Sequence, residues 1–329
     1  MKSILIASIA ATVVATGAWA QDKVTFGTNW LAQGGHGGFY QALVDGTYAK
    51  YGLDVTIEQG GPQVNNRPFL AAGKYDFLMA GNLLQSMDNV RNGIPTIVVA
   101  SYFEKDPQIL MAHKGAYKSF EDLANAPQIL IGKDGQFSFW QWMVKDKGFK
   151  DESLRPYGYN MAEYLQDTKM VQQGYATSEP NAAKAQGADP DVYVLADYGW
   201  NTYSTTIEAR TEMVATNPDL VQRFIDASTI GWYNYLYHDN AAANAAIIAA
   251  NPDQTIELLT AEVASMKEYG IIGTGSQAEM GIGAIDMARV QAFYDLAVAS
   301  GILEAGSVDV AKVATTQFVN KKVGMDLLP

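Results

Sequence analysis

Short β-rich runs alternate with helical patterns from Val24 onward, and this alternation restricts the possible folds more than any other feature. The runs are "KVTFGTN", "GLDVTIEQG", "YDFLMAG" and "PTIVVAS", and the helical patterns between them cover residues 36–51, 66–72 and 83–91. Such an order predicts a parallel sheet with helices on both faces. We expect the next apolar run, residues 107–113, to pair with this sheet before the chain leaves it.

The same alternation then starts again. Strands are predicted at "QILIGKDG", "KMVQQGYA" and "DVYVLADYG", and helices at "SFEDLA", "FSFWQWMVKDKG" and "SEPNAAKAQG". Ser119 is expected to cap the first of these helices. Asn217 and Pro218 then predict the start of a long helix, because proline is favoured at the first helical position. From there the pattern is helical almost to the end of the chain.

These two units predict an α/β fold with two lobes: two doubly wound sheets joined by two crossing strands near residues 111 and 205. Residues 21–111 and 205–329 would form lobe I, and residues 112–204 would form lobe II as an insertion. Open parallel sheets bind ligands at the carboxyl ends of their strands. In two hinged lobes those ends face each other across a cleft, so the sequence predicts a hinged clamp that closes around its ligand.

The first twenty residues, "MKSILIASIAATVVATGAWA", have the basic start, apolar run and small-residue end of a secretory signal. We expect cleavage after Ala20 and a free monomer in the periplasm. The chain of 329 residues has a formal net charge of −12 and no cysteine. Net acidity argues against nucleic acid and anionic membranes as partners, and the lack of cysteine excludes thiol catalysis. The three histidines fit no metal-ligand spacing, so neither a metal nor another cofactor is expected.

The turn after the first predicted strand is unusually rich in glycine. In "TNWLAQGGHGGFY", four glycines surround a single histidine. Glycines this dense after a strand indicate that the backbone approaches another group closely, and we expect that group to be the ligand. Trp30 is expected to form one face of an aromatic slot, with Tyr102, Trp140 or Trp200 as its opposite face.

The other residues expected at the ligand follow the carboxyl ends of the predicted strands and are polar or aromatic: Asn29, His36, Asn65, Asn82, Phe137, Glu179 and Tyr198. Lys105 and Lys133 are the only basic residues at these ends, whereas anion sites usually recruit arginine. Flat aromatic faces with amide and carboxylate edges suit a planar, polar heterocycle. Alternatives remain: each aromatic could pack in a core, Glu179 could serve only a helix N-terminus capped by Ser178, and His36 could bond only to its own loop.

A resemblance to a known family is carried by the segments "TNWLAQGGH", "YGLDVTI", "GKYDF", "NGIPT" and "NPDLVQRF". Through these segments the chain resembles the periplasmic binding proteins for thiamine-pyrimidine precursors, nitrate and sulfonates, the NitT/TauT-like group of ABC importers. Within this family, Asn29, Trp30, His36 and "GYNMAEYL" (158–165) resemble the thiamine-pyrimidine branch most closely. The resemblance adds Tyr159 to the expected ligand-binding residues. It also implies an inner-membrane ABC permease with a cytoplasmic ATPase as partner.

The same resemblance bears on whether the chain is an enzyme. The eukaryotic enzymes of this branch consume one of their own histidines, hold pyridoxal phosphate with a lysine and carry a cysteine-rich iron-binding run. The matching positions here are Gln85, Gly81 and "GWNTY" (199–203), so all three elements are missing. We therefore expect a receptor that binds a small planar nitrogen heterocycle, such as a thiamine-precursor pyrimidine. Riboflavin or another flavin-like ring and a sulfonate or nitrate-type anion are the alternative ligands, and a secreted enzyme is the competing class.

Overall fold

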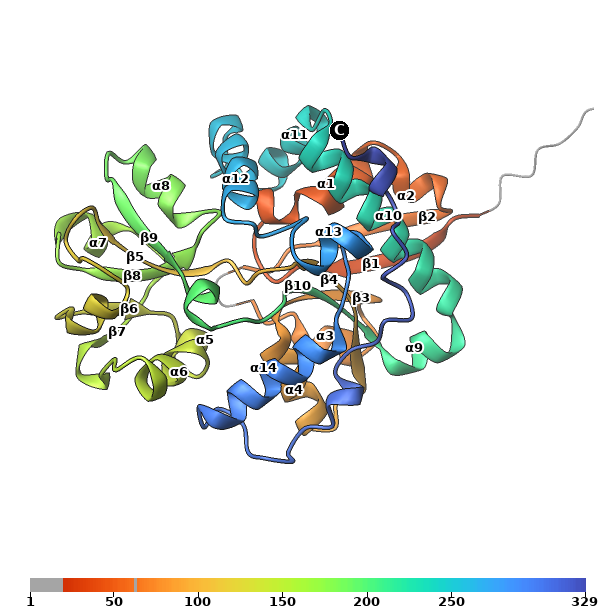
Figure 1. Cartoon of the computed structure of the whole chain (residues 1–329). Helices are drawn as coiled ribbons and strands as arrows, with labels where there is room; N and C mark the ends of the chain where they lie inside the picture. Colours follow the sequence, from red (N-terminus) through yellow and green to blue (C-terminus); the bar gives the residue numbers. More distant parts are fainter. Residues whose placement is uncertain (1–19, 62–63) are drawn as a thin grey trace, which may run out of the picture.

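The computed structural model describes residues 20–61 and 64–329, which form two α/β lobes (Figure 1). The predicted signal sequence lies outside the described residues except for Ala20. The first sheet has the order β2-β1-β3-β10-β4, with strands β1 (Asp22–Gly27), β2 (Leu53–Glu58), β3 (Phe77–Asn82), β4 (Thr96–Phe103) and β10 (Ser204–Arg210). Strands β2 and β3 run parallel to β1, whereas β10 runs antiparallel to β3 and β4. The predicted two-lobed α/β class is confirmed, with mixed sheets in place of parallel ones.

The second sheet has the order β7-β6-β8-β5-β9, with strands β5 (Gln108–His113), β6 (Ile129–Ile131), β7 (Leu154–Pro156), β8 (Val171–Tyr175) and β9 (Pro190–Val194). The expectation that residues 107–113 pair with the first sheet is therefore wrong. Strand β5 lies antiparallel between β8 and β9, where Ile109 is opposite Gly174 and Val194. Its apolar run identifies a buried central strand but carries no information about which sheet contains it.

Two short segments cross between the sheets. Residues 104–107 connect β4 to β5, and the turn η4 (Leu195–Tyr198) with residues 199–203 connects β9 to β10. The sequence predicted the first crossing near residue 111, but it begins earlier, at residue 104. Arg289 holds both crossings: its Nη1 donates to Glu104 Oε1 at 2.7 Å, and its Nη2 donates to the Thr202 carbonyl oxygen at 3.3 Å. A single guanidinium therefore fixes the spacing of the two connections.

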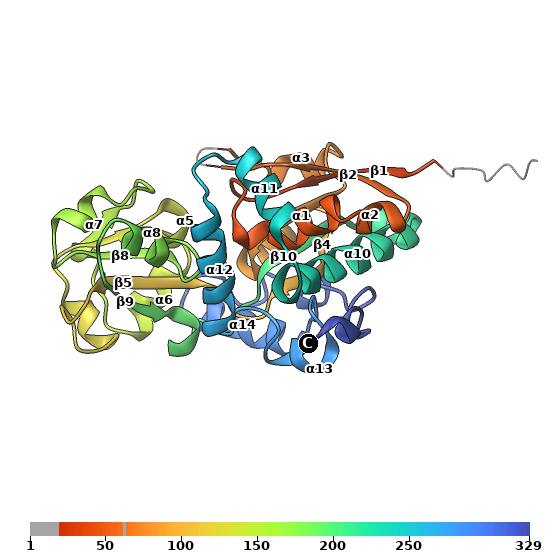
Figure 2. The same cartoon turned by 90° about the horizontal axis from the view of Figure 1, so that it is seen from above.

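Helices surround both sheets (Figures 1 and 2). The first lobe carries η1 (Gly34–His36), α1 (Gly37–Val44), α2 (Thr47–Lys50), α3 (Arg67–Ala71), α4 (Leu83–Arg91), α9 (Thr211–Thr216), α10 (Pro218–Tyr237), α11 (Ala241–Ala250), α12 (Ile256–Glu268), α13 (Ser276–Met280), α14 (Met287–Ala299), η5 (Val310–Lys312) and η6 (Met325–Leu327). The second lobe carries η2 (Glu121–Asn125), α5 (Lys133–Gln136), α6 (Phe139–Asp146), η3 (Asp151–Ser153), α7 (Ala162–Gln166) and α8 (Glu179–Ala185).

Most helix boundaries follow local signals, and α10 begins at Pro218 as predicted. The predicted cap Ser119 lies one residue outside the N-cap of η2, which is Phe120, although Ser119 Oγ accepts a hydrogen bond from the Asp122 amide at 3.3 Å. The helix expected over 36–51 is divided, because Gly46 adopts a left-handed conformation with φ of 77°. The helix expected in "FSFWQWMVKDKG" is likewise preceded by a separate short helix, α5.

The glycines that follow β1 approach helices instead of a ligand. A Cβ at Gly37 would lie 2.0 Å from Tyr235, and one at Gly38 would lie 2.2 Å from Trp232, both on α10. A Cβ at Gly34 would lie 2.5 Å from Glu262 on α12. The expectation that these glycines make room for the ligand is wrong, because they make room for helix packing. Gly35 differs, since a Cβ there would meet only ordinary contacts at 3.7 Å or more.

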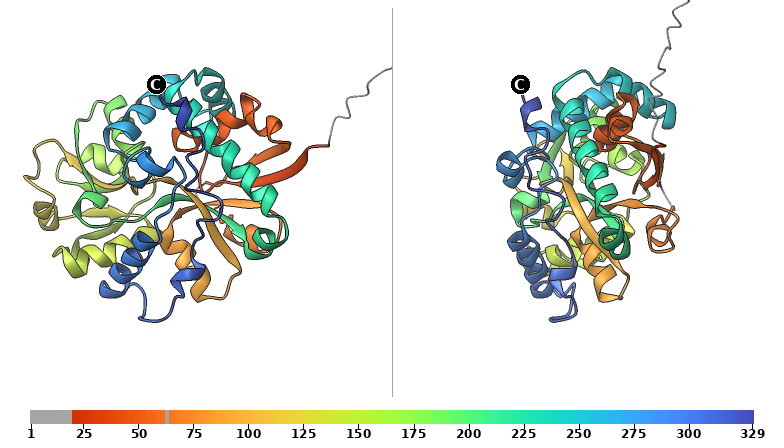
Figure 3. Two further views of the ribbon diagram at one scale, coloured as in Figure 1. Left: turned by 45° about the vertical axis from the view of Figure 1, so that its right-hand side comes forward. Right: turned by 90° about the vertical axis from the view of Figure 1, so that its right-hand side faces the viewer.

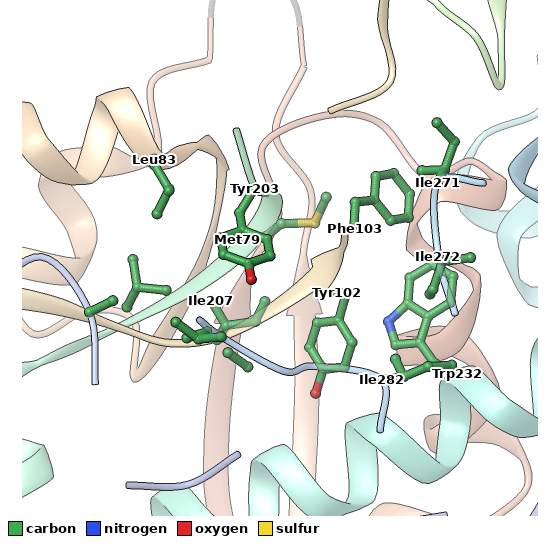
Figure 4. Close-up of a cluster of buried hydrophobic side chains, with 14 of the residues drawn as sticks. Met79, Leu83, Tyr102, Phe103, Tyr203, Ile207, Trp232, Ile271, Ile272 and Ile282 are labelled. Carbon is green, nitrogen blue, oxygen red and sulfur yellow. The ribbon is translucent and has the colours of Figure 1, made fainter. Parts of the chain in front are cut away.

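The core of the first lobe is aromatic and lies between the sheet and α10 (Figure 4). Tyr102 is fully buried, its ring centroid lies 6.0 Å from that of Trp232, and its hydroxyl donates to the Ile225 carbonyl oxygen at 3.1 Å. The C-terminal segment, dark blue in Figure 3, continues this layer along β4, where isolated bridges pair Ser101 with Gly283 and Val98 with Ala314. No helix in the described part of the chain is long and apolar enough to cross a membrane.

Candidate ligand-binding site between the lobes

Two aromatic rings from opposite lobes meet at the carboxyl ends of the sheets. Trp30 lies in the turn after β1, and Tyr159 lies between β7 and α7. Their ring centroids are 5.2 Å apart, with an angle of 47° between the ring planes. Both side chains retain solvent exposure, and Tyr159 is 45 % exposed. The Trp30 ring therefore faces a partner across the lobes, as the aromatic slot requires.

Tyr159 is held in an unusual backbone conformation. Its φ of 56° lies in the left-handed region, which costs energy for a residue with a side chain. The ring leans on Tyr157, with 5.0 Å between the centroids. Its hydroxyl group lies so close to Gly132 that a Cβ there would be 2.6 Å from the oxygen. The second lobe thus positions this ring through a glycine on β6's carboxyl end and a second tyrosine.

The three aromatics expected opposite Trp30 lie elsewhere. Tyr102 belongs to the core of the first lobe, as described above. Trp140 is fully buried in the second lobe, where its Nε1 donates to Asp151 Oδ1 at 2.8 Å. Trp200 is fully buried beside the crossing segments, with its ring 5.1 Å from that of Phe293. The prediction that one of them forms the opposite face is wrong, because an aromatic residue near a strand end can equally turn toward the helix layer.

His36 forms hydrogen bonds within the turn that carries Trp30. The side chain is 1 % exposed, and burial lowers its pKa to about 4, so the ring is neutral at pH 7. Its Nδ1 accepts from the Gln33 amide at 3.3 Å, which places the ring proton on Nε2. Nε2 lies 3.3 Å from Asn29 Oδ1 and donates to it. His36 therefore orients Asn29, the residue directly before Trp30. The geometry supports the alternative that His36 forms hydrogen bonds within its own loop.

Glu179 begins helix α8 in the second lobe. Its Oε2 accepts hydrogen bonds from the Tyr175 amide, at 2.7 Å, and from the Ser178 hydroxyl. Gly174 allows this approach, because a Cβ there would lie 2.7 Å from the Glu179 side chain. Burial raises the pKa of Glu179, and its charge in turn contributes to the raised pKa values of Tyr157 and Tyr159. The carboxylate thus belongs to the same tyrosine-lined end of the second lobe.

Asn82 and Asp106 join the site to the crossing segments. Asn82 caps α4, where its Oδ1 accepts from the Leu84 amide at 3.1 Å, and its Nδ2 donates to Asp106 Oδ2 at 3.3 Å. The same Asp106 oxygen accepts from Trp200 Nε1 at 3.2 Å. Burial raises the pKa of Asp106 to about 6. One carboxylate therefore links the end of β3 to both connections between the lobes.

Three further expected residues lie apart from the Trp30–Tyr159 pair or face solvent. The Phe137 side chain is 68 % exposed between α5 and α6. Tyr198 stacks on Phe120 within the second lobe, with centroids 4.0 Å apart and planes 16° apart. Asn65 is exposed, and its Oδ1 accepts from the nearby Arg67 amide at 3.2 Å. Contact of Asn65 or Phe137 with a ligand stays a prediction, whereas Tyr198 contributes to the packing of its own lobe.

The geometry also reveals residues that sequence reasoning missed. Asp106 ends the run "SYFEKD" and could have been identified as a strand-end carboxylate. Gln173 accepts from the Gly132 amide at 2.7 Å and so fixes the turn beneath Tyr159. Glu262 accepts from the Gly34 amide at 2.6 Å, although it is distant in sequence from every predicted strand end. No local signal distinguishes Glu262 from any other glutamate in a helix.

The charged groups around the site favour a ligand that donates hydrogen bonds over an anionic ligand. Lys105 is bound to Asp197 and donates to the Tyr269 carbonyl oxygen, and Arg289 is bound to Glu104. Lys105 of the first crossing and Arg289 of α14 therefore already have anionic partners, whereas none of the ion pairs among the described residues includes Lys133. Among the described residues, no group of three or more histidine, aspartate or glutamate side chains is arranged to hold a metal ion. The site offers aromatic faces, amide groups and carboxylates.

Comparison with known proteins agrees with this architecture. The riboflavin-binding protein RibY of Chloroflexus aurantiacus is 22% identical over 307 residues, which cover 90% of this chain and 86% of RibY. The alkanesulfonate-binding protein SsuA of Xanthomonas axonopodis pv. citri, in complex with MOPS, superimposes with a TM-score of 0.64 and 12% identity, over 91% of this chain and 99% of SsuA.

The periplasmic nitrate-binding protein NrtA of Synechocystis PCC 6803 superimposes with a TM-score of 0.61 and 14% identity, over 91% of this chain and 87% of NrtA. At such identities the structural likeness establishes the fold of a periplasmic binding protein. The sequence profile described as NMT1/THI5 like matches residues 33–243, which is more than half of the chain. This chain is therefore a member of the NMT1/THI5-like family.

Proposed function

We propose that this protein is the substrate-binding component of an ABC importer and that its ligand is a small planar nitrogen heterocycle. The family match, the two-lobed fold and the likeness to solute-binding proteins support the receptor role. The ligand binds between the lobes, its ring lies between Trp30 and Tyr159, and Glu179 accepts a hydrogen bond from a donor at the ring's edge. Asn29 and Asn82 supply amide groups nearby.

The observation that carries this proposal is the Trp30–Tyr159 pair. Rings from two separate lobes lie 5.2 Å apart, tilted by 47° and partly exposed, so no tight stacking holds them together. A planar ligand that stacks on both rings needs roughly 7 Å between them, twice a van der Waals contact of about 3.5 Å, so the lobes open slightly from this spacing to admit it. Aromatic pairs contribute roughly 0.5–1.5 kcal/mol beyond the burial of apolar area. Two such faces would therefore join the lobes through the ligand.

A flavin-like ring is the second candidate. The supporting observation is the likeness to RibY along 90% of this chain, since RibY is described as riboflavin-binding. A three-ring system would use the same aromatic faces. Sulfonate or nitrate-type anions receive less support, because Lys105 and Arg289 are paired with carboxylates.

The cellular setting follows from the same proposal. The receptor would act in the periplasm as a monomer and deliver its ligand to an inner-membrane permease with a cytoplasmic ATPase. The solved relative NrtA is described as periplasmic, which supports this location. The predicted signal sequence would direct export. Mass measurement of the mature protein from a periplasmic extract would test cleavage after Ala20.

A thermal-shift screen tests the ligand class. Pyrimidines, flavins and sulfonates would be compared on the wild-type protein and on Trp30→Ala. A ligand at about 100 times its Kd stabilises the folded state by about 2.7 kcal/mol. We expect a planar heterocycle to raise the melting temperature of the wild type and to lose this effect in Trp30→Ala. A sulfonate that stabilises both proteins equally would refute the aromatic slot.

A further inference from the structure

Glu262 is a buried carboxylate without a positively charged partner. It lies on α12, is 3 % exposed and accepts from the Gly34 amide at 2.6 Å. Among the ion pairs formed by the described residues, none includes Glu262. Burying an ionised carboxylate without a counter-charge is costly. The receptor mechanism described so far makes no use of this group.

Helix α12 brings Glu262 to the junction of the two lobes. Figure 2 shows α12 lying between the first and second lobes, alongside α8. Ser265, three residues after Glu262 and thus on the same helix face, accepts from Asn181 Nδ2 at 3.1 Å. Asn181 is in the first turn of α8, two residues after Glu179. Glu262 and Glu179 therefore approach the same junction from opposite lobes.

The charge of Glu179 acts on Glu262. Burial raises the pKa of Glu262 to about 8, the hydrogen bonds from the Gly34 and Gly35 amides oppose this increase, and the charge of Glu179 adds to it. Burial likewise raises the pKa of Glu179. The other elements against α12 supply no compensating cation: η1 offers only the neutral His36, α11 has no ionisable residue, α10 offers Tyr235, and Lys184 of α8 is exposed. With its pKa near 8, Glu262 retains its proton at neutral pH.

We propose that the ligand carries a positive charge, on a protonated amine or a quaternised ring nitrogen, and that Glu179 and Glu262 together neutralise it. This inference rests on the proposed function and makes it more specific. A cation at the junction takes the place of the retained proton, so that both carboxylates can be ionised without repelling each other. The faces of Trp30 and Tyr159 add cation–π attraction. Because Glu262 also holds Gly34, four residues after Trp30, neutralisation stabilises the turn that carries the stacking ring.

A charge series on one ring tests the proposal. The probes are nicotinate, nicotinamide and 1-methylnicotinamide, which are an anion, a neutral molecule and a permanent cation on the same six-membered ring. We expect calorimetry at pH 7.5 to show the cation binding about tenfold more tightly than the neutral amide, the ratio expected for one charge-assisted contact. Nicotinate should bind most weakly. Equal affinities, or a preference for nicotinate, would overturn the proposal while leaving the planar-ring receptor intact.

The proton balance provides a second readout. Because 1-methylnicotinamide has no proton to lose from its ring nitrogen, any proton released on binding comes from the protein. We expect the apparent binding enthalpy at pH 7.5 to vary with the ionisation enthalpy of the buffer in the wild type. Glu262→Gln should remove this dependence, since glutamine keeps an acceptor for Gly34 but cannot titrate. Proton release that persists unchanged in Glu262→Gln would contradict the assignment.

Variants separate charge from packing. Glu262→Gln should abolish the tenfold preference for the cation. Glu179→Gln, in the other lobe, should also abolish it and provides the test if Glu262→Gln folds poorly. Glu268→Gln, an exposed position on the same helix, is the matched control and should keep the wild-type preference. If the wild type binds none of the three probes at millimolar concentration, the planar-heterocycle function itself is refuted, together with this extension.

Discussion

At the scale of single residues, Trp30 and Tyr102 show how similar sequence positions lead to different roles. Trp30 follows β1 and Tyr102 lies at the end of β4, and both were expected at the ligand. Trp30 stays half-exposed because the chain turns away from the sheet at this point, whereas Tyr102 is still within β4 and points into the helix layer. The side chain's direction, not the residue's position at a strand end, decides whether it can contact a ligand.

Replacement of Trp30 should affect binding and not folding. Trp30→Ala should cost at least ~2 kcal/mol of ligand affinity, because a stacked face and buried ring area are lost. Trp30→Phe should keep much of the affinity. Tyr102→Phe is the matched control: it loses the hydroxyl bond to Ile225 and about 1 kcal/mol of stability, with unchanged affinity. Calorimetry and thermal unfolding of the three variants would check this, and a large stability loss in Trp30→Ala would place Trp30 in the core.

His36 should make the protein sensitive to acid. Its pKa is about 4 in the folded state and 6.5 when exposed, so the unfolded chain binds a proton that the folded chain does not. The contribution of His36 to the unfolding free energy should therefore decrease by up to about 3 kcal/mol as the pH falls from about 6.5 to 4, while the raised pKa values of Asp106 and Glu262 act in the opposite direction. The difference in unfolding free energy between the wild type and His36→Gln should change by this amount over the same pH range.

The exposed histidine provides the control for this measurement. His238 lies at the surface beside the Leu327 carbonyl oxygen, so His238→Gln should retain the wild-type slope between pH 6.5 and 4. The comparison is made with urea unfolding at a series of pH values. Equal slopes for wild type and His36→Gln would show that His36 does not remain neutral in the folded state.

At the scale of secondary-structure elements, the glycine-rich turn sets the distance between α1 and α10. Gly38 and Gly231 face each other so closely that a Cβ at Gly231 would lie 2.2 Å from the Gly38 carbonyl oxygen. The α1–α10 contact in turn positions η1 and the Trp30 turn above it. The glycines therefore serve the site indirectly, by holding two helices in close contact.

A methyl group in this contact should be costly. Gly38→Ala places a Cβ 2.2 Å from Trp232 Cγ and should destabilise the protein by about 1–3 kcal/mol or more through overpacking. Gly35→Ala is the control in the same turn, since its Cβ would meet only ordinary contacts. Chemical unfolding of both variants measures the difference. Equal stability of the two variants would mean that α1 and α10 can separate without cost.

The elements also show what the sequence could predict. Alternation of strands and helices predicted two α/β lobes, and Pro218 marked the start of α10, because both signals are local. The sheet that contains β5 could not be predicted, since an apolar run fits any buried strand. The partner of Gly34 could not be predicted either, because Glu262 reaches it only through tertiary packing. Trp30 and Tyr159 were both expected at the ligand, but their pairing across the lobes depends on how the lobes are joined.

At the scale of the whole molecule, the lobes meet through a few polar and aromatic contacts beside the crossings. The Asn181–Ser265 hydrogen bond and the Trp30–Tyr159 ring contact join surfaces that belong to different sheets. Arg289 fixes the two crossings at one end of this contact. Such an arrangement suits hinge motion, in which ligand binding brings the lobes together.

A disulfide between the lobes should lock this motion. The chain has no cysteine, so Asn181→Cys with Ser265→Cys introduces one defined pair. We expect the oxidised protein to be compact in small-angle X-ray scattering with or without ligand, and the reduced protein to expand when ligand is removed. The single variant Asn181→Cys is the control. An identical radius of gyration in every state would rule out a hinge that responds to ligand.

The position of β10 has a consequence for how the chain is made. This strand lies between β3 and β4 and is the only described strand that pairs with both, yet it is synthesised after the whole second sheet. The second sheet needs only residues 108–194. Pulsed hydrogen exchange during refolding should therefore show protection in β5 and β8 before β3 and β4, and simultaneous protection would contradict this order. The inserted lobe can mature while the lobe that encloses it is still an open half-sheet, so the contact surface between the lobes is completed last.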